Sequence, residues 1–227
     1  MERLIIEELL QWKTSPRRKP LILNGARQVG KTWILKHFGE MHYDNVAYIN
    51  CDKESLAAKL FEDYDTKRII QAIEAMTNTQ IVAGKTLIII DEIQEIPRGL
   101  HALKYFAENA PEQHIAVAGS LLGLLLHQGE SFPVGKVNML QMHPMTFMEF
   151  LKAIGEDKIY QQLLNREWSV TNTVHEKIVK HLRMYLYVGG MPEAVQAYCD
   201  NVPLREIRSI HNEILTAYIN DLSKHAP

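Results

Sequence analysis

An apolar run, a glycine-rich loop and a Lys-Thr pair follow one another near the start of the chain. The run at residues 21–23 precedes the stretch NGARQVGKT at residues 24–32, which fits the pattern G-x-x-x-x-G-K-[ST]. Glycines in such a loop let backbone N–H groups curl around phosphates without a clash from a Cβ atom. A helix that begins at the Lys-Thr pair adds the positive end of its dipole to the anion site. This position, after a strand and before a helix, favours a phosphate-binding loop over a turn without a ligand.

The predicted phosphate loop contributes side chains as well as backbone groups. Lys31 is expected to reach the β- and γ-phosphates of a nucleotide, and the Thr32 hydroxyl is expected to bind Mg²⁺. The candidates for nucleotide binding are Gly25, Ala26, Arg27, Gln28, Val29, Gly30, Lys31, Thr32 and Trp33.

A second apolar run ends in two carboxylates. The stretch TLIIIDEIQ at residues 86–94 contains a strand too apolar to be exposed, and Asp91 and Glu92 follow it. Asp91 is expected to hold Mg²⁺, usually through water, and Glu92 to polarise the water that attacks the γ-phosphate. The competing interpretation is that both acids cap the following turn. The acid pair predicts an ATPase that cleaves the β–γ phosphoanhydride, and the lack of an Asn-Lys-x-Asp segment favours ATP over GTP.

Three further polar residues are candidates for a role at the phosphates. Ser120, at the end of HIAVAGS, is expected to sense the γ-phosphate or position water, although a serine after glycine is also an ordinary strand exit. Lys136 is a candidate cation for the charge of the transition state, in its own or a neighbouring subunit. Arg183 is a second candidate cation, in the C-terminal part of the chain.

Apolar runs of β type alternate with helical stretches up to residue 142. After an entry helix within residues 2–13, strands are predicted at residues 21–23, 45–51, 86–90, 114–118 and 137–142, and helices at residues 32–38, 55–61, 67–76 and 99–108. Strands buried on both faces that alternate with helices predict an α/β fold, with a parallel sheet covered by helices.

The period of the apolar residues changes near residue 143. In the remaining chain, β-type runs disappear and apolar residues recur at steps of three and four, which is typical of helices. The predicted domains are therefore 1–142, a core with its entry helix, and 143–227, a helical lid or linker region. In the segment YVGGMPEAV, residues 187–195, we expect the two glycines to end one helix and Pro192 to start the next. A direct nucleotide contact is the alternative for that segment.

Composition narrows the class of protein. Of the 227 residues, 46% are hydrophobic and 23% are charged, as in ordinary globular proteins. A formal net charge of −2 gives no overall basic surface for nucleic acid, although Arg17, Arg18 and Lys19 form a local cationic run. Cys51 and Cys199 lack the spacing of a disulfide framework or a zinc site. No apolar stretch is long enough to span a bilayer and no signal-peptide pattern is present, so a cytoplasmic location is expected.

The motifs resemble those of a known family, the bacterial and archaeal ATPases that pair an AAA-type (AAA_14) P-loop core with a C-terminal domain of unknown function, DUF4143. The resemblance rests on GARQVGKT, LIIIDEIQEIP, AGSLLGLLLHQGESFPVGKV, HPMTFMEFL, YVGGMPEAV and AYINDLSKHAP, and it spans nearly the whole chain. It implies a three-layer P-loop NTPase fold of the additional strand catalytic Glu type, with five parallel strands in the order 5-1-4-3-2 and a helical lid. Similar proteins continue beyond DLSKHAP, so the resemblance implies a chain truncated before most of DUF4143.

The resemblance also implies roles for individual residues. It assigns phosphate binding to Gly25, Gly30, Lys31 and Thr32, metal and water roles to Asp91 and Glu92, and a sensor role to Ser120. The predicted function is Mg²⁺-dependent ATP binding and hydrolysis coupled to movement of the helical region, with ATP and Mg²⁺ as cofactors and no membrane partner. Two alternatives stay open: a nucleotide-gated binding module with little turnover, and the ATPase part of a DNA-acting, nuclease-like protein. A homo-oligomer is a further possibility, because AAA-type ATPases often complete their sites with a cation from a neighbour.

Overall fold

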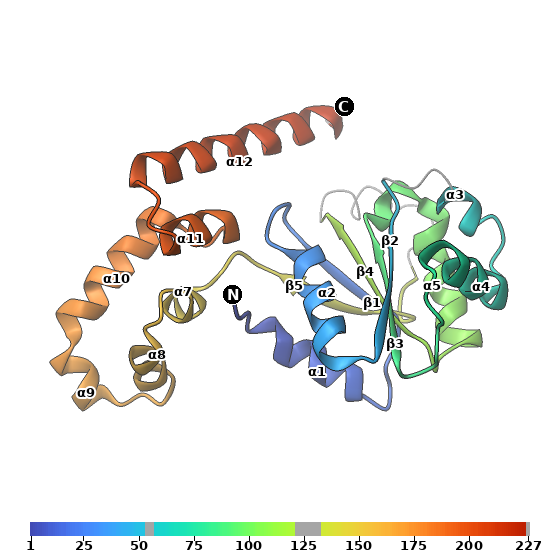
Figure 1. The fold of residues 1–227 in the computed structure, drawn as a ribbon, viewed down its shortest axis with the longest axis horizontal. Helices are drawn as coiled ribbons and strands as arrows, with labels where there is room; N and C mark the ends of the chain where they lie inside the picture. Colours follow the sequence, from blue (N-terminus) through green and yellow to red (C-terminus); the bar gives the residue numbers. More distant parts are fainter. Residues whose placement is uncertain (53–56, 121–132, 226–227) are drawn as a thin grey trace. The chain divides into compact units, whose positions relative to one another are not determined.

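The structure is a computed structural model of the 227-residue chain, and it describes residues 1–52, 57–120 and 133–225 (Figure 1). The chain divides into two compact units, and each unit has its own hydrophobic core. The sheet unit comprises residues 5–26 and 30–142, and the helical unit comprises residues 1–4, 27–29 and 143–227. Within the described ranges, no helix is both long and apolar enough to cross a membrane.

The sheet unit contains a five-stranded parallel sheet. Its strands are β1 (Leu21–Gly25), β2 (Asn45–Asn50), β3 (Thr86–Asp91), β4 (His114–Ser120) and β5 (Asn138–Met142). They lie in the order β2-β3-β4-β1-β5, and every neighbouring pair is parallel. Counted from the β5 edge, this order is the predicted 5-1-4-3-2, so the predicted P-loop NTPase fold is confirmed.

Helices connect the strands and flank the sheet (Figure 1). They are α1 (Ile5–Thr14), α2 (Lys31–His42), α3 (Ala57–Leu60), α4 (Thr66–Thr77) and α5 (Pro97–Asn109), with a short 3-10 helix η1 (Ile93–Glu95) after β3. The helices predicted within residues 2–13 and at residues 32–38, 67–76 and 99–108 are confirmed, most of them with longer ends, whereas the helix predicted at residues 55–61 ends earlier, at Leu60. Of the helix predicted at residues 55–61, the first two positions lie outside the described residues.

The three central strands of the sheet are buried on both faces, which explains their continuous apolar runs. All residues of β1 and β3 are buried. Alternate side chains, such as Ile22, Ile88 and Val117, pack in one cluster with Phe61 and Phe106. Helix α2 contacts β1, β2, β3 and β4, and α1 packs against α2. Helices thus cover the sheet as expected for parallel strands.

The carboxyl ends of the strands meet at one edge of the sheet. In the register of β1, Gly25 pairs with Ser120 of β4 and with Met142 of β5, while Asn50 of β2 pairs with Asp91 of β3. The loop that follows Gly25 and the acid that ends β3 therefore lie at the same edge. In open parallel sheets, ligands bind outside this edge.

The helical unit has no strand among its described residues, in agreement with the change of period in the sequence. Its helices are α7 (Phe147–Ala153), α8 (Asp157–Leu164), α9 (Trp168–Thr173), α10 (His175–Val188), α11 (Pro192–Cys199) and α12 (Leu204–His225). One buried cluster consists of Met145, Phe150, Val188, Ala194, Val195 and Ile207. Gly189, with φ 73°, ends α10, and Pro192 begins α11, so the prediction for the glycine pair and the proline is confirmed.

Candidate functional site

The backbone of the loop between β1 and α2 requires its glycines. A Cβ atom on Gly25 would lie 2.3 Å from the carbonyl oxygen of Met142 in the adjacent strand. Gln28 and Gly30 have left-handed backbones, with φ of 63° and 93°, and Gly30 directly precedes α2. The first backbone N–H groups of a helix have no partner within it, and a concave loop that ends in a helix N-terminus binds anions. The loop therefore has the backbone of a phosphate cradle.

The ammonium group of Lys31 lies within this loop. Its Nζ atom donates hydrogen bonds to the carbonyl oxygens of Gly25 (3.0 Å) and Ala26 (2.8 Å), and the residue is buried. A phosphate oxygen is a stronger acceptor for an ammonium group than a neutral carbonyl oxygen is. These two hydrogen bonds thus keep the Lys31 ammonium group inside the loop, where a phosphate would bind.

A short hydrogen bond joins the helix after the loop to the strand that bears the acids. Thr32 Oγ1 donates to Asp91 Oδ2 at 2.7 Å, although the two residues are 59 positions apart in the chain. Mg²⁺ at phosphate sites takes one or two protein oxygen ligands and completes its shell with phosphate and water oxygens. A hydroxyl and a carboxylate oxygen at this separation fit such an ion.

Asp91 and Glu92 take different positions after β3. The backbone N–H of Glu92 donates to Asp91 Oδ1 at 3.1 Å, so Asp91 caps the turn with one oxygen and faces Thr32 with the other. Glu92 has a left-handed backbone, with φ 53° and ψ 42°, which is uncommon for a residue with a side chain and is concentrated at functional sites. Its carboxylate accepts a hydrogen bond from Gln94 Nε2 at 2.5 Å. The two neighbouring carboxylates thus have different hydrogen-bond partners.

Tyr48 of β2 is a site residue that the sequence motifs did not indicate. Its hydroxyl donates to Asp91 Oδ2 at 3.1 Å, and the Lys36 ammonium lies 3.4 Å from its ring centroid. Burial, together with the nearby carboxylates of Asp91 and Glu92, raises the pKa of the Tyr48 hydroxyl to about 12, although the hydrogen bond from Asn50 lowers it. The hydroxyl is therefore a proton donor throughout the neutral pH range, and it holds Asp91 in place from the strand next to β3.

Ser120 and Lys136 lie at different edges of the sheet. The backbone of Ser120 pairs with that of Gly25, in the strand between β1 and β3, as predicted; its side chain lies outside what the structure describes. Lys136 precedes the amino end of β5, and its Nζ lies 2.9 Å from Glu108 Oε1. Because the strands are parallel, this is the edge opposite the phosphate loop, so the fold does not bring Lys136 to the site of its own chain.

The two other predicted residues, Arg183 and Trp33, lie on helices. Arg183 lies on α10 of the helical unit, where it lines a hollow with His175 and Lys180. Trp33 is 48% exposed and stacks on His37, with ring centroids 4.8 Å apart. The residues that the sheet unit brings together are thus Lys31, Thr32, Asp91, Glu92 and the unpredicted Tyr48.

The sheet order and the loop define a P-loop NTPase of the AAA class. Family comparison makes this specific: residues 17–151, more than half of the chain, match the model of an AAA domain (AAA_14), and the chain belongs to that family. It is thereby an AAA-type, nucleotide-binding module. Residues 179–227 match a second family model, a domain of unknown function named DUF8612. The resemblance predicted DUF4143 for the region after the core, and the matching model there is a different one.

Three solved structures have folds similar to that of this chain. They are Drosophila ORC bound to DNA (14% identity, TM-score 0.49, 92% of this chain and 66% of that chain), AMPPCP-bound DnaA from Aquifex aeolicus (14%, 0.46, 87% and 58%) and the Aeropyrum pernix ORC1 protein in complex with DNA (13%, 0.40, 93% and 81%). The chain thus spans less than two thirds of the length of the Drosophila ORC and Aquifex aeolicus DnaA chains. No curated protein matches the sequence.

Proposed function

We propose that the chain is an ATPase that binds Mg-ATP at the loop between β1 and α2 and hydrolyses it. The observation that carries this proposal is the 2.7 Å hydrogen bond between Thr32 Oγ1 and Asp91 Oδ2. It joins the two motifs that an ATPase of this class needs, the phosphate loop and the acid-bearing strand, at one edge of the sheet. Lys31 lies in the same loop, within hydrogen-bonding distance of two of its carbonyl oxygens.

Each residue has a task in this proposal. The loop amides and Lys31 bind the β- and γ-phosphates, and Thr32 and Asp91 hold the metal ion. Mg²⁺, when bound, neutralises the charge on the phosphate oxygens. Tyr48 keeps Asp91 oriented through its hydrogen bond to Oδ2. Ser120, whose strand lies between β1 and β3, is proposed to sense the γ-phosphate.

Glu92 is the proposed general base. A carboxylate that accepts a proton from water raises the nucleophilicity of that water toward the γ-phosphate. In the described geometry the carboxylate accepts a hydrogen bond from Gln94. Catalytic hydrogen bonds often form only in the complex with substrate, so Glu92 must exchange this partner for water during the reaction.

Loss of the γ-phosphate is proposed to change the conformation of the chain. Nucleotide hydrolysis releases loops that the γ-phosphate and its metal hold. We assign the two working parts as residues 1–142 and residues 143–227, a catalytic core and a region that responds to it. A cation from a neighbouring copy is the role left for Lys136, because its own phosphate loop lies at the opposite edge of the sheet.

ATP turnover by the wild-type chain and by Glu92→Gln tests the proposal. The substitution keeps the size of the side chain and removes the base, so kcat should fall by roughly 10²–10⁴-fold while the affinity for Mg-ATP stays within about threefold. Glu95→Gln is the matched control, because Glu95 is an exposed acid in the same turn. Turnover that is equal in wild type and Glu92→Gln would remove the assignment of the base.

The hydrogen bond from Gln94 to Glu92 also favours a second candidate function, a nucleotide-gated binding module with little turnover. If this bond keeps the base from water, the wild type should retain nucleotide and hydrolyse it as slowly as Glu92→Gln does. Gln94→Ala should then raise turnover, because it frees the carboxylate. In an active ATPase the same substitution should leave turnover unchanged or lower it.

A further inference from the structure

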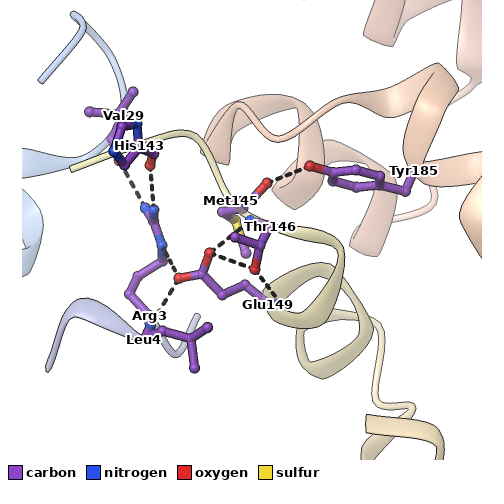
Figure 2. Close-up of polar contacts among 8 residues, drawn as sticks. All are labelled: Arg3, Leu4, Val29, His143, Met145, Thr146, Glu149 and Tyr185. Atoms are coloured by element: carbon purple, nitrogen blue, oxygen red, sulfur yellow. Dashed lines mark hydrogen bonds and ion pairs between the residues drawn. The ribbon is translucent and has the colours of Figure 1, made fainter. Parts of the chain in front are cut away.

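A buried arginine near the start of the chain connects three segments of the helical unit (Figure 2). The Arg3 guanidinium donates from Nη1 to the carbonyl oxygen of Val29 (2.9 Å), from Nη2 to that of His143 (2.7 Å) and from Nε to Glu149 Oε1 (2.9 Å). The side chains of Arg3 and Glu149 are only 6% and 5% exposed. One planar fork thus holds the phosphate loop, the segment after β5 and helix α7.

Glu149 is fixed as firmly as Arg3 (Figure 2). Its Oε1 atom also accepts the backbone N–H of Leu4 (2.9 Å), and its Oε2 atom accepts the backbone N–H of Thr146 (2.7 Å), which caps the start of α7. Burial raises the pKa of the Glu149 carboxyl, but the amides of Thr146 and Leu4, together with Arg3, outweigh burial and lower the pKa overall. The carboxylate is therefore charged at neutral pH, and Arg3 keeps an oriented counter-ion.

The contact with Val29 has a consequence for the phosphate loop. The C=O of Val29 and the N–H of Gly30 belong to one planar trans peptide unit, in which they point in opposite directions. A group that holds the carbonyl oxygen therefore also fixes the direction of the Gly30 N–H. Gly30 is the left-handed residue before α2, with φ 93° and ψ 25°, and its N–H is one of the amides of the phosphate loop.

A second side chain holds the same part of the loop. The hydroxyl of Tyr218, on α12, donates to the carbonyl oxygen of Arg27 at 2.8 Å. Two carbonyl groups within residues 27–29 are thus bound by side chains from elsewhere in the helical unit. Their peptide planes are set by tertiary contacts as well as by the local sequence.

We infer that Arg3 is a positioning residue for the phosphate loop. It holds the Val29–Gly30 peptide in the orientation that nucleotide phosphates require, and through Glu149 it connects this peptide to the first turn of α7. The inference rests on the proposed nucleotide binding. By linkage, a nucleotide that needs this orientation must in turn stabilise the contacts of Arg3.

The dissociation constant of Mg-ADP for Arg3→Lys tests the inference. Lysine keeps the positive charge beside Glu149 but cannot bind three acceptors with a planar fork. We expect Arg3→Lys to weaken binding about tenfold or more, as for loss of a hydrogen bond from a charged group. Glu2→Gln is the matched control, because Glu2 is the adjacent residue and its ion pair with Lys152 is at the surface. The control should bind within about twofold of wild type at temperatures where all chains are folded.

Hydrogen exchange of the wild-type chain gives a second readout, which holds even if Arg3→Lys does not fold. Bound Mg-ADP should slow exchange at the amides of Leu4 and Thr146, both of which donate to Glu149. Lys31→Ala, treated in the same way, should show no such slowing. An arginine with a structural role alone would lower the unfolding temperature of Arg3→Lys and leave the dissociation constant unchanged.

The outcomes separate this inference from the proposed function. Wild-type affinity in Arg3→Lys, or unchanged exchange at both amides with nucleotide bound, overturns the role of Arg3 while nucleotide binding stands. A wild-type chain that does not bind Mg-ADP overturns both. Weaker binding by Arg3→Lys, with normal binding by Glu2→Gln, supports the inference.

Discussion

At the scale of single residues, His114 makes the stability of the sheet unit depend on pH. It begins β4, is buried, and lies with its Nδ1 atom 2.7 Å from the hydroxyl of Tyr43. Burial, together with the positive charges of Arg18 and Lys13, lowers the pKa of His114 from its usual 6.5 to about 4. The folded chain therefore keeps this imidazole neutral in mildly acidic solution.

The free energy of unfolding should fall as the pH is lowered from about 6.5 to about 4. In this window the unfolded chain binds a proton at His114 and the folded chain does not, so acid favours unfolding, by at most about 3 kcal/mol. Urea denaturation at several pH values should show a smaller loss in His114→Gln than in wild type. His175→Gln, at an exposed position, is the control and should behave as wild type does. An identical pH dependence in His114→Gln and wild type would contradict this account.

The residues of the candidate site were predictable to different degrees. Lys31, Thr32, Asp91 and Glu92 stand in short motifs, where neighbours in the sequence define the chemistry. Tyr48 and Arg3 do not, because their acidic partners lie 43 and 146 positions away. No short sequence motif contains both partners of either contact, so these contacts can be identified only in the folded chain.

At the scale of elements, the connection between α10 and α11 depends on a close approach of two backbones. A Cβ atom on Gly190 would lie 2.2 Å from the carbonyl oxygen of Met145, and the Met145 N–H donates to the Gly190 carbonyl oxygen at 2.6 Å. The Tyr185 hydroxyl donates to the same Met145 carbonyl at 2.8 Å (Figure 2). The backbone of Met145, held by these two hydrogen bonds, thus leaves no room for a side chain at position 190.

Gly190→Ala should therefore lower the free energy of unfolding by about 3 kcal/mol or more, because backbone atoms must move to admit the methyl group. Gly155→Ala is the comparison, since Gly155 has a positive φ of 78° but open space around it. Gly155→Ala should lower the free energy of unfolding by about 1–2 kcal/mol, because only backbone strain opposes the methyl group. Denaturant unfolding of both variants measures the difference. Equal losses would mean that the contact with Met145 does not limit this position.

The elements themselves were largely predictable, and their ends were less so. Strand positions followed from continuous apolar runs, which a parallel sheet requires. The helix after the loop was predicted to end at Phe38, and it continues to His42. Gly39 is not a stop signal there but a contact point, where a Cβ atom would lie 2.5 Å from Val46 Cγ2. The glycine pair before α11 was predicted as a helix end. The close approach of Gly190 to Met145 was not predictable, because the two residues are remote in the sequence.

At the scale of the whole molecule, the AAA domain and the helical region that follows it differ in how far their sequences predict the family. The AAA domain over residues 17–151 carries short motifs in which phosphate and metal binding require particular residue types at fixed spacing. The helices after residue 143 show apolar positions at steps of three and four, a pattern that many helical domains share. Helical structure was therefore predictable in this part, and the family was not, since residues 179–227 match DUF8612 rather than DUF4143.

Isothermal titration of the chain with Mg-ADP tests the central claim most directly, that the loop between β1 and α2 binds a magnesium nucleotide. The wild type should bind one nucleotide per chain, and removal of Mg²⁺ should weaken binding. Lys31→Ala should weaken it about 100-fold or more, because charge-assisted hydrogen bonds to phosphate are lost. Lys67→Ala, which removes an exposed lysine from α4, is the control and should bind as the wild type does. Binding by Lys31→Ala as tight as that of the wild type, or no binding by the wild type, would contradict the account.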